Sequence, residues 1–229
     1  MLKTKGYTIN LNTNAYIMPP ADCVSRLKVS LDDFAADSWD KLVGVQGAFN
    51  KVCKNIKKAS KLCDLSITYT LSKENYRKAP MFAWWSLREF PDQYATFFSI
   101  YKGTDPRFAW DDASAEDFWT NVHPYIEVNL GDTESGKLFA ETCTDKRRVV
   151  QGNRFPENMD LEKPCFLSFS ERVVSPAGKI YNCSHLYRDG IYTNSGHKHE
   201  KCRYGCNLRL VKFNEEVERR LYNGKGSNN

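Results

Sequence analysis

Four cysteines in the last third of the chain have the type and spacing of a metal site: Cys165, Cys183, Cys202 and Cys206. Cys202 and Cys206 are separated by three residues, so one short turn can direct both sulfurs at the same ion. Four thiolates that converge on one point repel one another unless a cation neutralises their charge. The sequence therefore predicts that these four cysteines bind a metal.

The spacing leaves the identity of the metal open. The gaps are wider than the paired C-x-x-C of common zinc ribbons, and irregular gaps suit an iron–sulfur cluster at least as well. His197 and His199 lie between Cys183 and Cys202, so a zinc site that uses cysteine and histidine is an alternative. A set of unrelated reduced thiols is a further alternative, which the reactivity of exposed thiols makes less favoured.

The composition indicates a packed protein in a reducing compartment. The 229 residues are 41% hydrophobic and 13% aromatic, which argues against disorder. We find no apolar run that would span a bilayer, and the first residues lack the apolar core of a signal peptide, so we expect a cytoplasmic protein without membrane association. The net charge of +5 is spread along the chain, which makes nucleic acid only a weak candidate partner.

The first half of the sequence alternates between strand and helix patterns. Strand patterns cover 7–11, 24–31, 65–71 and 94–101, and helix patterns cover 35–42, 48–62 and 75–88. Such alternation is typical of parallel βαβ units. The predicted fold class is therefore α/β, with a parallel sheet of the kind that forms part of a (β/α) barrel.

The lysines of one predicted helix and the aromatic residues of another each allow a structural or a binding interpretation. In 48–62, lysines fill much of the surface beside an apolar stripe, and a solvated face is the simplest explanation. Aromatic residues in 75–90 recur at helical spacing: Phe82, Trp84, Trp85 and Phe90. They fit either a platform on which nucleic-acid bases stack or, more simply, the protein core.

The second half of the sequence predicts a separate small domain. Ser114, followed by Asp117, predicts a helix start, and residues 131–163 are rich in glycine, polar residues and proline. Strand patterns over 166–174 and 179–183 flank Ser-Pro-Ala-Gly, which is a β-hairpin signal, and a helix is predicted over 214–222. The predicted division is a domain over 1–130, a connection over 131–163, a domain over 164–223 and a polar tail over 224–229.

Several segments resemble the radical S-adenosylmethionine (SAM) superfamily, in particular members with a SPASM or twitch extension. The matching segments are 12–14, similar to the end of the family's third barrel strand with Ala15 in place of glycine; 27–32, similar to the fourth strand; 44–49, similar to the following helix entry; and 66–75, similar to the fifth strand and its turn. Their order and spacing carry the resemblance more than any one segment does. The resemblance implies strands three to six of a partial barrel.

The C-terminal half of the resemblance concerns the cysteines. Cys165, Gly178 and Cys183 give C-x(12)-G-x(4)-C, which is similar to the opening of SPASM-type extensions. The resemblance implies an auxiliary [4Fe–4S] cluster whose remaining ligands are Cys202 and Cys206. The sequence has too few cysteines for a second auxiliary cluster, so the resemblance favours the twitch kind.

The sequence lacks the C-x(3)-C-x(2)-C motif that binds the catalytic cluster in this family, with which SAM is cleaved to a 5′-deoxyadenosyl radical. The resemblance therefore implies that the missing strands and motif come from a partner chain or that the gene is interrupted. It implies that the chain does not cleave SAM alone and uses SAM as a cofactor only if the missing N-terminal half is supplied. It also implies a SAM or substrate cavity lined by residues at strand ends: Asn14, Ser30, Thr68 and Asn75. Turn formation and strand capping explain these four residues equally well.

The substrate stays open, because relatives of this kind act on peptides and on small molecules. The alternative function is a non-catalytic or zinc-stabilised binding protein derived from the same fold.

Overall fold

The computed structural model describes residues 6, 8–20, 23–101, 103, 105–143, 166, 173–181 and 208–223. Contacts divide the chain into two units, Met1–Gly152 and Asn153–Asn229. All four predicted metal ligands, Cys165, Cys183, Cys202 and Cys206, lie outside the described residues, as do His197 and His199. The structure therefore bears directly on the first unit and on two elements of the second.

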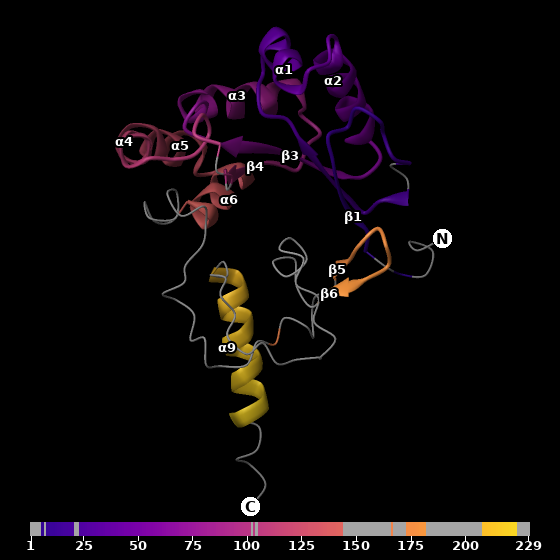
Figure 1. Ribbon diagram of the computed structural model, residues 1–229, viewed down its shortest axis with the longest axis vertical. Coiled ribbons are helices and arrows are strands. Elements are labelled where there is room, and N and C mark those ends of the chain that lie inside the picture. The colour runs from indigo at the N-terminus through magenta and orange to yellow at the C-terminus, as the bar shows by residue number, and fades with distance from the viewer. Residues whose placement is uncertain are drawn as a thin grey trace, which may run out of the picture. The chain divides into compact units, whose positions relative to one another are not determined.

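The first unit is built on a four-stranded sheet in the order β1-β2-β3-β4 (Figure 1). The strands are β1 Asn10–Thr13, β2 Arg26–Ser30, β3 Asp64–Leu71 and β4 Ala95–Ile100. All three neighbouring pairs are parallel, which confirms the predicted α/β class. The first strand begins later than the predicted 7–11, because pairing starts where the Ile9 carbonyl accepts the Ser25 amide at 2.9 Å.

Helices α1 Ala36–Val43, α2 Ala48–Ala59 and α3 Ala79–Glu89 lie on one side of these strands (Figure 1). Helix α2 has no N-cap side chain of its own. Asp40 of α1 replaces it, since its two carboxylate oxygens accept the backbone amides of Gly47 at 2.5 Å and Phe49 at 2.7 Å. A carboxylate at this end also complements the helix dipole, so one acidic residue fixes the angle between α1 and α2.

Proline determines where α3 begins. A short 3₁₀ turn, Tyr76–Lys78, precedes the helix, and Pro80 occupies its first turn. The missing amide of proline costs nothing there, because the first amides of a helix have no partner within the helix. The predicted helix over 75–88 is thereby corrected to a 3₁₀ turn followed by α3.

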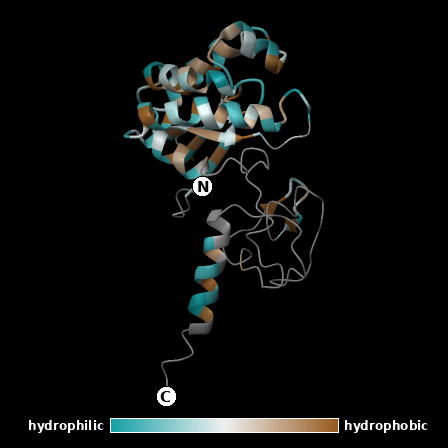
Figure 2. Cartoon of the chain, turned by 90° about the vertical axis from the view of Figure 1, so that its left-hand side faces the viewer, coloured by the Kyte–Doolittle hydropathy of each residue, from teal (hydrophilic) through white to brown (hydrophobic). Residues whose placement is uncertain are grey.

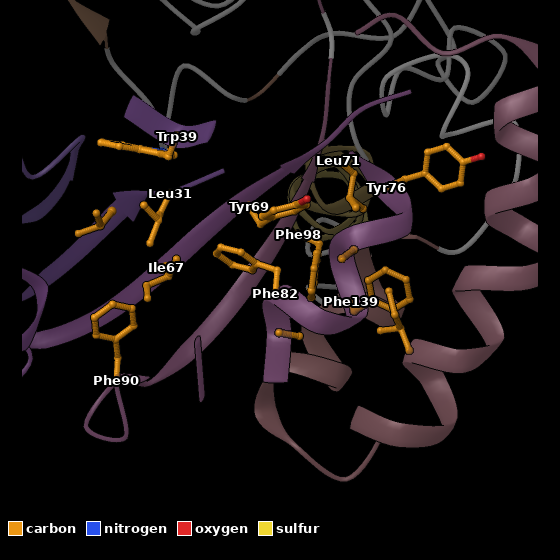
Figure 3. Close-up of a cluster of buried hydrophobic side chains, with 14 of the residues drawn as sticks. Leu31, Trp39, Ile67, Tyr69, Leu71, Tyr76, Phe82, Phe90, Phe98 and Phe139 are labelled. Carbon is orange, nitrogen blue, oxygen red and sulfur yellow. The ribbon is translucent and has the colours of Figure 1, made fainter. Parts of the chain in front are cut away.

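Strand β3 shows how the core is organised. Its buried side chains alternate with partly exposed ones: Leu65, Ile67, Tyr69 and Leu71 are buried, and Ser66, Thr68 and Thr70 are half-buried. The buried set packs against the helices, as in the contact of Tyr69 with Phe82 of α3, whose ring centroids are 4.3 Å apart (Figure 3). The alternation that predicted the strand therefore also separates an apolar face from a polar one.

Four helical segments follow the sheet: α4 Asp112–Asp117, the π-helical segment η4 Phe118–Val122, α5 His123–Leu130 and α6 Glu134–Thr142. The predicted helix start at Ser114 is corrected to Asp112. Asp111 is the N-cap, and its carboxylate accepts the Ser114 amide at 2.8 Å while the Ser114 hydroxyl accepts the Asp111 amide at 3.1 Å. Ser114 thus belongs to the cap but is not its first residue.

The segment 131–163, predicted as a connection, contains helix α6 near its start. Phe139 of this helix is fully buried and lies 5.4 Å from Phe98 of β4, centroid to centroid (Figure 3). The Ser135 hydroxyl accepts the Thr96 amide at 2.9 Å, so α6 also caps the outer edge of β4. The core of the first unit therefore continues well beyond residue 130.

The described part of the second unit contains a hairpin and a helix. Strands β5 Val173–Val174 and β6 Ile180–Tyr181 pair antiparallel, which confirms the predicted hairpin. Gly178 takes a φ of +77° in its turn, a conformation that favours glycine. Helix α9 spans Leu208–Asn223, longer than predicted, with hydrophobic and hydrophilic residues interspersed (Figure 2). Throughout the described chain, every helix is too short or too polar to span a bilayer.

Candidate functional site

The face of the sheet opposite α1, α2 and α3 carries polar side chains, and we call it the polar face. Its members, aligned by strand register, are Lys28 and Ser30 of β2, Ser66, Thr68 and Thr70 of β3, and Phe97 and Ser99 of β4. Strands of parallel sheets are usually apolar on both sides, because both sides are covered. A row of hydroxyl groups on one side indicates that this side meets water or a polar ligand.

Two of the four predicted cavity residues lie at strand ends, and a third is their neighbour inside β3. Ser30 ends β2 and pairs in register with Thr68 of β3. Asn14 directly follows β1, whose last residue Thr13 pairs with Val29. Because parallel strands end on the same side, the structure brings Asn14 and Ser30 to the carboxyl edge, where open α/β sheets bind ligands, whereas Thr68 lies beside Ser30 within β3, three residues before that strand ends.

Among these three residues, Thr68 has a side-chain hydroxyl whose hydrogen bonding is unsatisfied in the described structure. Within the described part of the chain its hydroxyl oxygen is buried and has no hydrogen-bond partner. A buried polar group without a partner costs about 1–3 kcal/mol. Such groups are rare in folded proteins and need an explanation. A ligand that hydrogen-bonds to Thr68 would supply one.

Asn75 and Asn14 are already engaged in turns. The Asn75 side chain accepts the Ser72 amide at 2.8 Å and donates to the Thr70 carbonyl at 2.9 Å, which closes the turn after β3. The Asn14 side chain accepts the Tyr16 amide at 3.1 Å. Both residues therefore shape the edge of the sheet, and their contact with a ligand stays a prediction.

The turn after β1 holds an unusual backbone conformation. Ala15 is fully buried and has a φ of +57°, in the left-handed region where a residue other than glycine costs about 1–2 kcal/mol. Its amide donates to Thr13 Oγ1 at 3.0 Å, and its carbonyl accepts from the Asn55 side chain of α2 at 2.8 Å. The surrounding contacts thus hold a strained turn beside the candidate site, a feature that often accompanies function.

Two adjacent carboxylates at the end of β2 have opposite environments. Asp32 Oδ1 accepts the Thr70 amide at 2.6 Å, and burial raises the pKa of this carboxyl. Burial alone would also raise the pKa of Asp33, but hydrogen bonds from Ser38, two backbone amides and Lys78 outweigh burial and lower it. Neighbouring groups whose pKa values are pushed apart are typical of functional sites.

Asp32 and Lys28 extend the candidate site beyond the residues predicted from sequence. The Lys28 ammonium lies 4.3 Å from the centroid of the Phe97 ring, and burial lowers its pKa. The sequence could have indicated both residues, because Lys28, Ser30 and Asp32 occupy alternate positions along β2 and just beyond its end. A search limited to the last residue of each strand does not find this alternation.

Asp32→Asn is expected to raise the free energy of unfolding at neutral pH. The folded-state pKa of Asp32 is above its unfolded value, so the folded state is favoured at low pH and this contribution is lost as pH rises through the folded pKa. Asparagine still accepts the Thr70 amide and carries no charge. Urea unfolding should show a gain at neutral pH that disappears below about pH 4, the normal aspartate range. The exposed Asp92→Asn is the control and should show little change; an equal gain at all pH values would contradict the argument.

The described cysteines do not add a metal or thiol site. Cys23 and Cys53 are free thiols, and no group of three or more metal-binding side chains comes together among the residues that the structure describes. Cys53 lies in the apolar stripe of α2, and burial raises the pKa of its thiol to about 12. The reactive thiolate is therefore scarce at neutral pH.

No protein-family model matches the sequence, and no curated protein matches it. Among solved structures the chain is similar to SuiB from Streptococcus suis. The crystal structure of SuiB bound to SAM aligns with a TM-score of 0.50 and 12% identity over 83% of this chain, and that of SuiB aligns with 0.49, 12% and 83%. The chain spans 45% of the SAM-bound SuiB chain and 46% of the other. At this identity the likeness concerns the fold alone: the chain is similar in fold to part of SuiB.

Proposed function

We propose that the polar face binds SAM and that the chain is part of a radical SAM enzyme. The observation that carries the proposal is the buried hydroxyl of Thr68, which has no hydrogen-bond partner among the described residues and lies in β3 beside Ser30, the last residue of β2. The matching sequence segments support it, and so does the shared fold with SuiB, whose crystal structure holds SAM. The ligand would supply the hydrogen bond that Thr68 lacks.

The one-sided sheet supports a partial (β/α) barrel. In such a barrel β1 to β4 are strands three to six, the helices lie outside, and the polar face lines the interior. The carbonyl of Ile9, the residue before β1, points toward β2, because it accepts the amides of Ser25 and Arg26. Because alternate residues of a strand point to opposite neighbours, the backbone groups of Asn10 and Asn12 point away from β2 and can pair with a further strand. A partner chain or a further segment with the C-x(3)-C-x(2)-C motif would provide that strand.

We also propose that Cys165, Cys183, Cys202 and Cys206 hold an auxiliary [4Fe–4S] cluster, which supplies electron transfer when bound. The hairpin of the second unit supports this assignment. Its turn contains Gly178, and Cys183 follows β6 by two residues, as the C-x(12)-G-x(4)-C pattern requires. Four thiolates are the donor set that iron–sulfur clusters use.

Thr68→Val tests the SAM site, because valine has nearly the same shape as threonine and lacks the hydroxyl. The variant is expected to be at least as stable as the parent protein, since an unpaired buried hydroxyl is removed. Its affinity for SAM, measured on the full chain by saturation-transfer NMR, should be lower by about tenfold, the value of one good hydrogen bond.

Thr120→Val, an exposed position on η4, is the matched control and should leave SAM binding unchanged. The proposal fails if the parent chain shows no transfer from SAM. It fails equally if Thr68→Val binds SAM as well as the parent does.

A further inference from the structure

A groove of about 720 Å³ runs along the outer surface of the first unit, between α3 and the η4–α5 segment. It is separate from the polar face, because both of its walls are helical. Met81 and Trp84 of α3 line one wall, and Val122 and Tyr125 line the other. The two helices lie side by side in Figure 1. Both walls of the groove therefore carry large apolar side chains.

Large apolar side chains are exposed along this groove. Met81 is 57% exposed, Trp84 is 45% exposed and Tyr125 is 51% exposed. Val128, one turn beyond Tyr125 on α5 and outside the groove lining, is 84% exposed. Single exposed apolar residues are common on protein surfaces, but a contiguous group on two neighbouring helices marks an interaction site.

Two arginines stand at the ends of the α3 wall. Met81, Trp84 and Arg88 of α3 follow one another at steps of three and four residues, and Arg77 lies four residues before Met81 in the 3₁₀ turn that precedes the helix. Together they form one ridge of about 16 Å. Arg77 is held by Asp117 at 2.8 Å, whereas Arg88 has no ion pair among the described residues. Glu89 is the one acidic side chain that lines the groove in the described structure, and Lys57 of α2 pairs with it. The groove is therefore apolar in the middle, and Arg88 is the one cationic side chain at its rim without an ion pair among the described residues.

We propose that this groove docks an acidic amphipathic helix of a partner protein. A third helix would lay its apolar stripe on Trp84, Met81 and Tyr125 by ridges-into-grooves packing, and a carboxylate at its end would pair with Arg88. About 11 residues, or three turns, match the length of the ridge. Tryptophan, tyrosine and arginine are also the residues that contribute most to protein–protein affinity.

The charges favour this occupant over two others. A second copy of the chain that docked through the same groove would oppose arginine to arginine, which costs affinity. A nucleic-acid strand needs a series of cations along its backbone. Within the described structure the groove offers a single unpaired arginine at its rim, so a partner with an apolar stripe and few carboxylates fits better.

Two synthetic peptides test the proposal on the full chain. Both are helical, have about 15 residues and carry leucines at three- and four-residue steps. One carries glutamates at a few positions beside this apolar stripe, and the second carries lysines at the same positions. Calorimetric titration at physiological salt should show binding of the acidic peptide and at least tenfold weaker binding of the basic one. Arg88→Glu and Trp84→Ala should each reduce the affinity for the acidic peptide by about tenfold.

Matched controls separate docking from general effects of charge or folding. Lys58→Glu makes the same charge change on an exposed face of α2, and Leu42→Ala removes an apolar side chain that is 52% exposed on α1. Both should change the affinity by less than about twofold. Absence of binding by the acidic peptide overturns the proposal. Equal losses in Arg88→Glu and Lys58→Glu do so as well, and tighter binding of oligothymidylate that depends on Trp84 would identify a base-stacking platform instead.

Discussion

Anaerobically purified protein with Cys183→Ser is expected to lose most of its iron and its brown colour, while the parent protein keeps both. Serine is a poor replacement for a thiolate ligand, and an iron–sulfur cluster that loses one of four cysteines loses both a bond and charge balance. Cys183 is the ligand of choice for this test because it follows a strand of the hairpin by two residues. Metal analysis and the near-visible absorbance spectrum measure the effect.

Cys23→Ser is the matched control, because Cys23 is an exposed free thiol of the first unit. It should leave iron content and spectrum unchanged. A colourless parent protein with one zinc, lost in Cys183→Ser, would replace the iron–sulfur proposal with the zinc-stabilised alternative. If Cys183→Ser retains the full metal content and folds normally, the four-cysteine site is wrong. Neither outcome affects the SAM test at Thr68, which concerns the other unit.

The sheet was predictable because its strands alternate. In β3 every second residue is large and apolar, and this two-residue period predicted the strand correctly over nearly its whole length. Helix α2 was predictable for the corresponding reason, since its apolar residues recur at helical spacing and all of them are buried. Segments that bury one continuous face carry their structure in the local sequence.

The helices after β4 were less predictable, because their structure depends on distant contacts. Helix α6 has nine residues, and its buried Phe139 has too few apolar neighbours in sequence to show a period. Its place is determined by Phe98 of β4 and by the cap that Ser135 gives to Thr96. Neither contact can be read from the segment itself.

The aromatic run in α3 shows a mixed result. The prediction that it forms part of the core is confirmed for Phe82 and Phe90, which are buried. Trp84 is 45% exposed, because it is two residues from Phe82 and so lies on the other side of the helix. Composition alone treats the run as one unit, whereas helical geometry divides it between the core and the groove.

The candidate site was predictable in position but not in detail. Ser30 ends β2 as predicted, whereas Thr68, its neighbour in register, lies three residues before the end of β3 instead of at the strand end. The Thr68 hydroxyl has no hydrogen-bond partner among the described residues because of its surroundings in three dimensions. The pKa of Asp32 is raised because the carboxyl is buried. Sequence gives the residue types of such a site, but their energetic state follows from packing.

Phe118→Ala is expected to reduce the free energy of unfolding of the first unit by about 3–5 kcal/mol, the usual cost of emptying a buried phenylalanine site. Phe118 is fully buried and its ring lies 5.5 Å from Trp110 and 6.3 Å from Phe139. It also meets Tyr76 edge-on at 6.1 Å. One ring thus joins the turn before α3 to the helices after β4, so its loss weakens the attachment of both.

Urea unfolding and hydrogen exchange of the β3 amides measure this effect, because amides of a central strand report opening of the whole unit. The control is Val128→Ala, at a position 84% exposed, which should cost less than about 0.5 kcal/mol. If residues 110–143 were an independent connection, Phe118→Ala would speed exchange there and leave β3 protected. We expect exchange to become faster in both regions together, since a domain stabilised by about 5–15 kcal/mol cannot lose so large a share of its core locally.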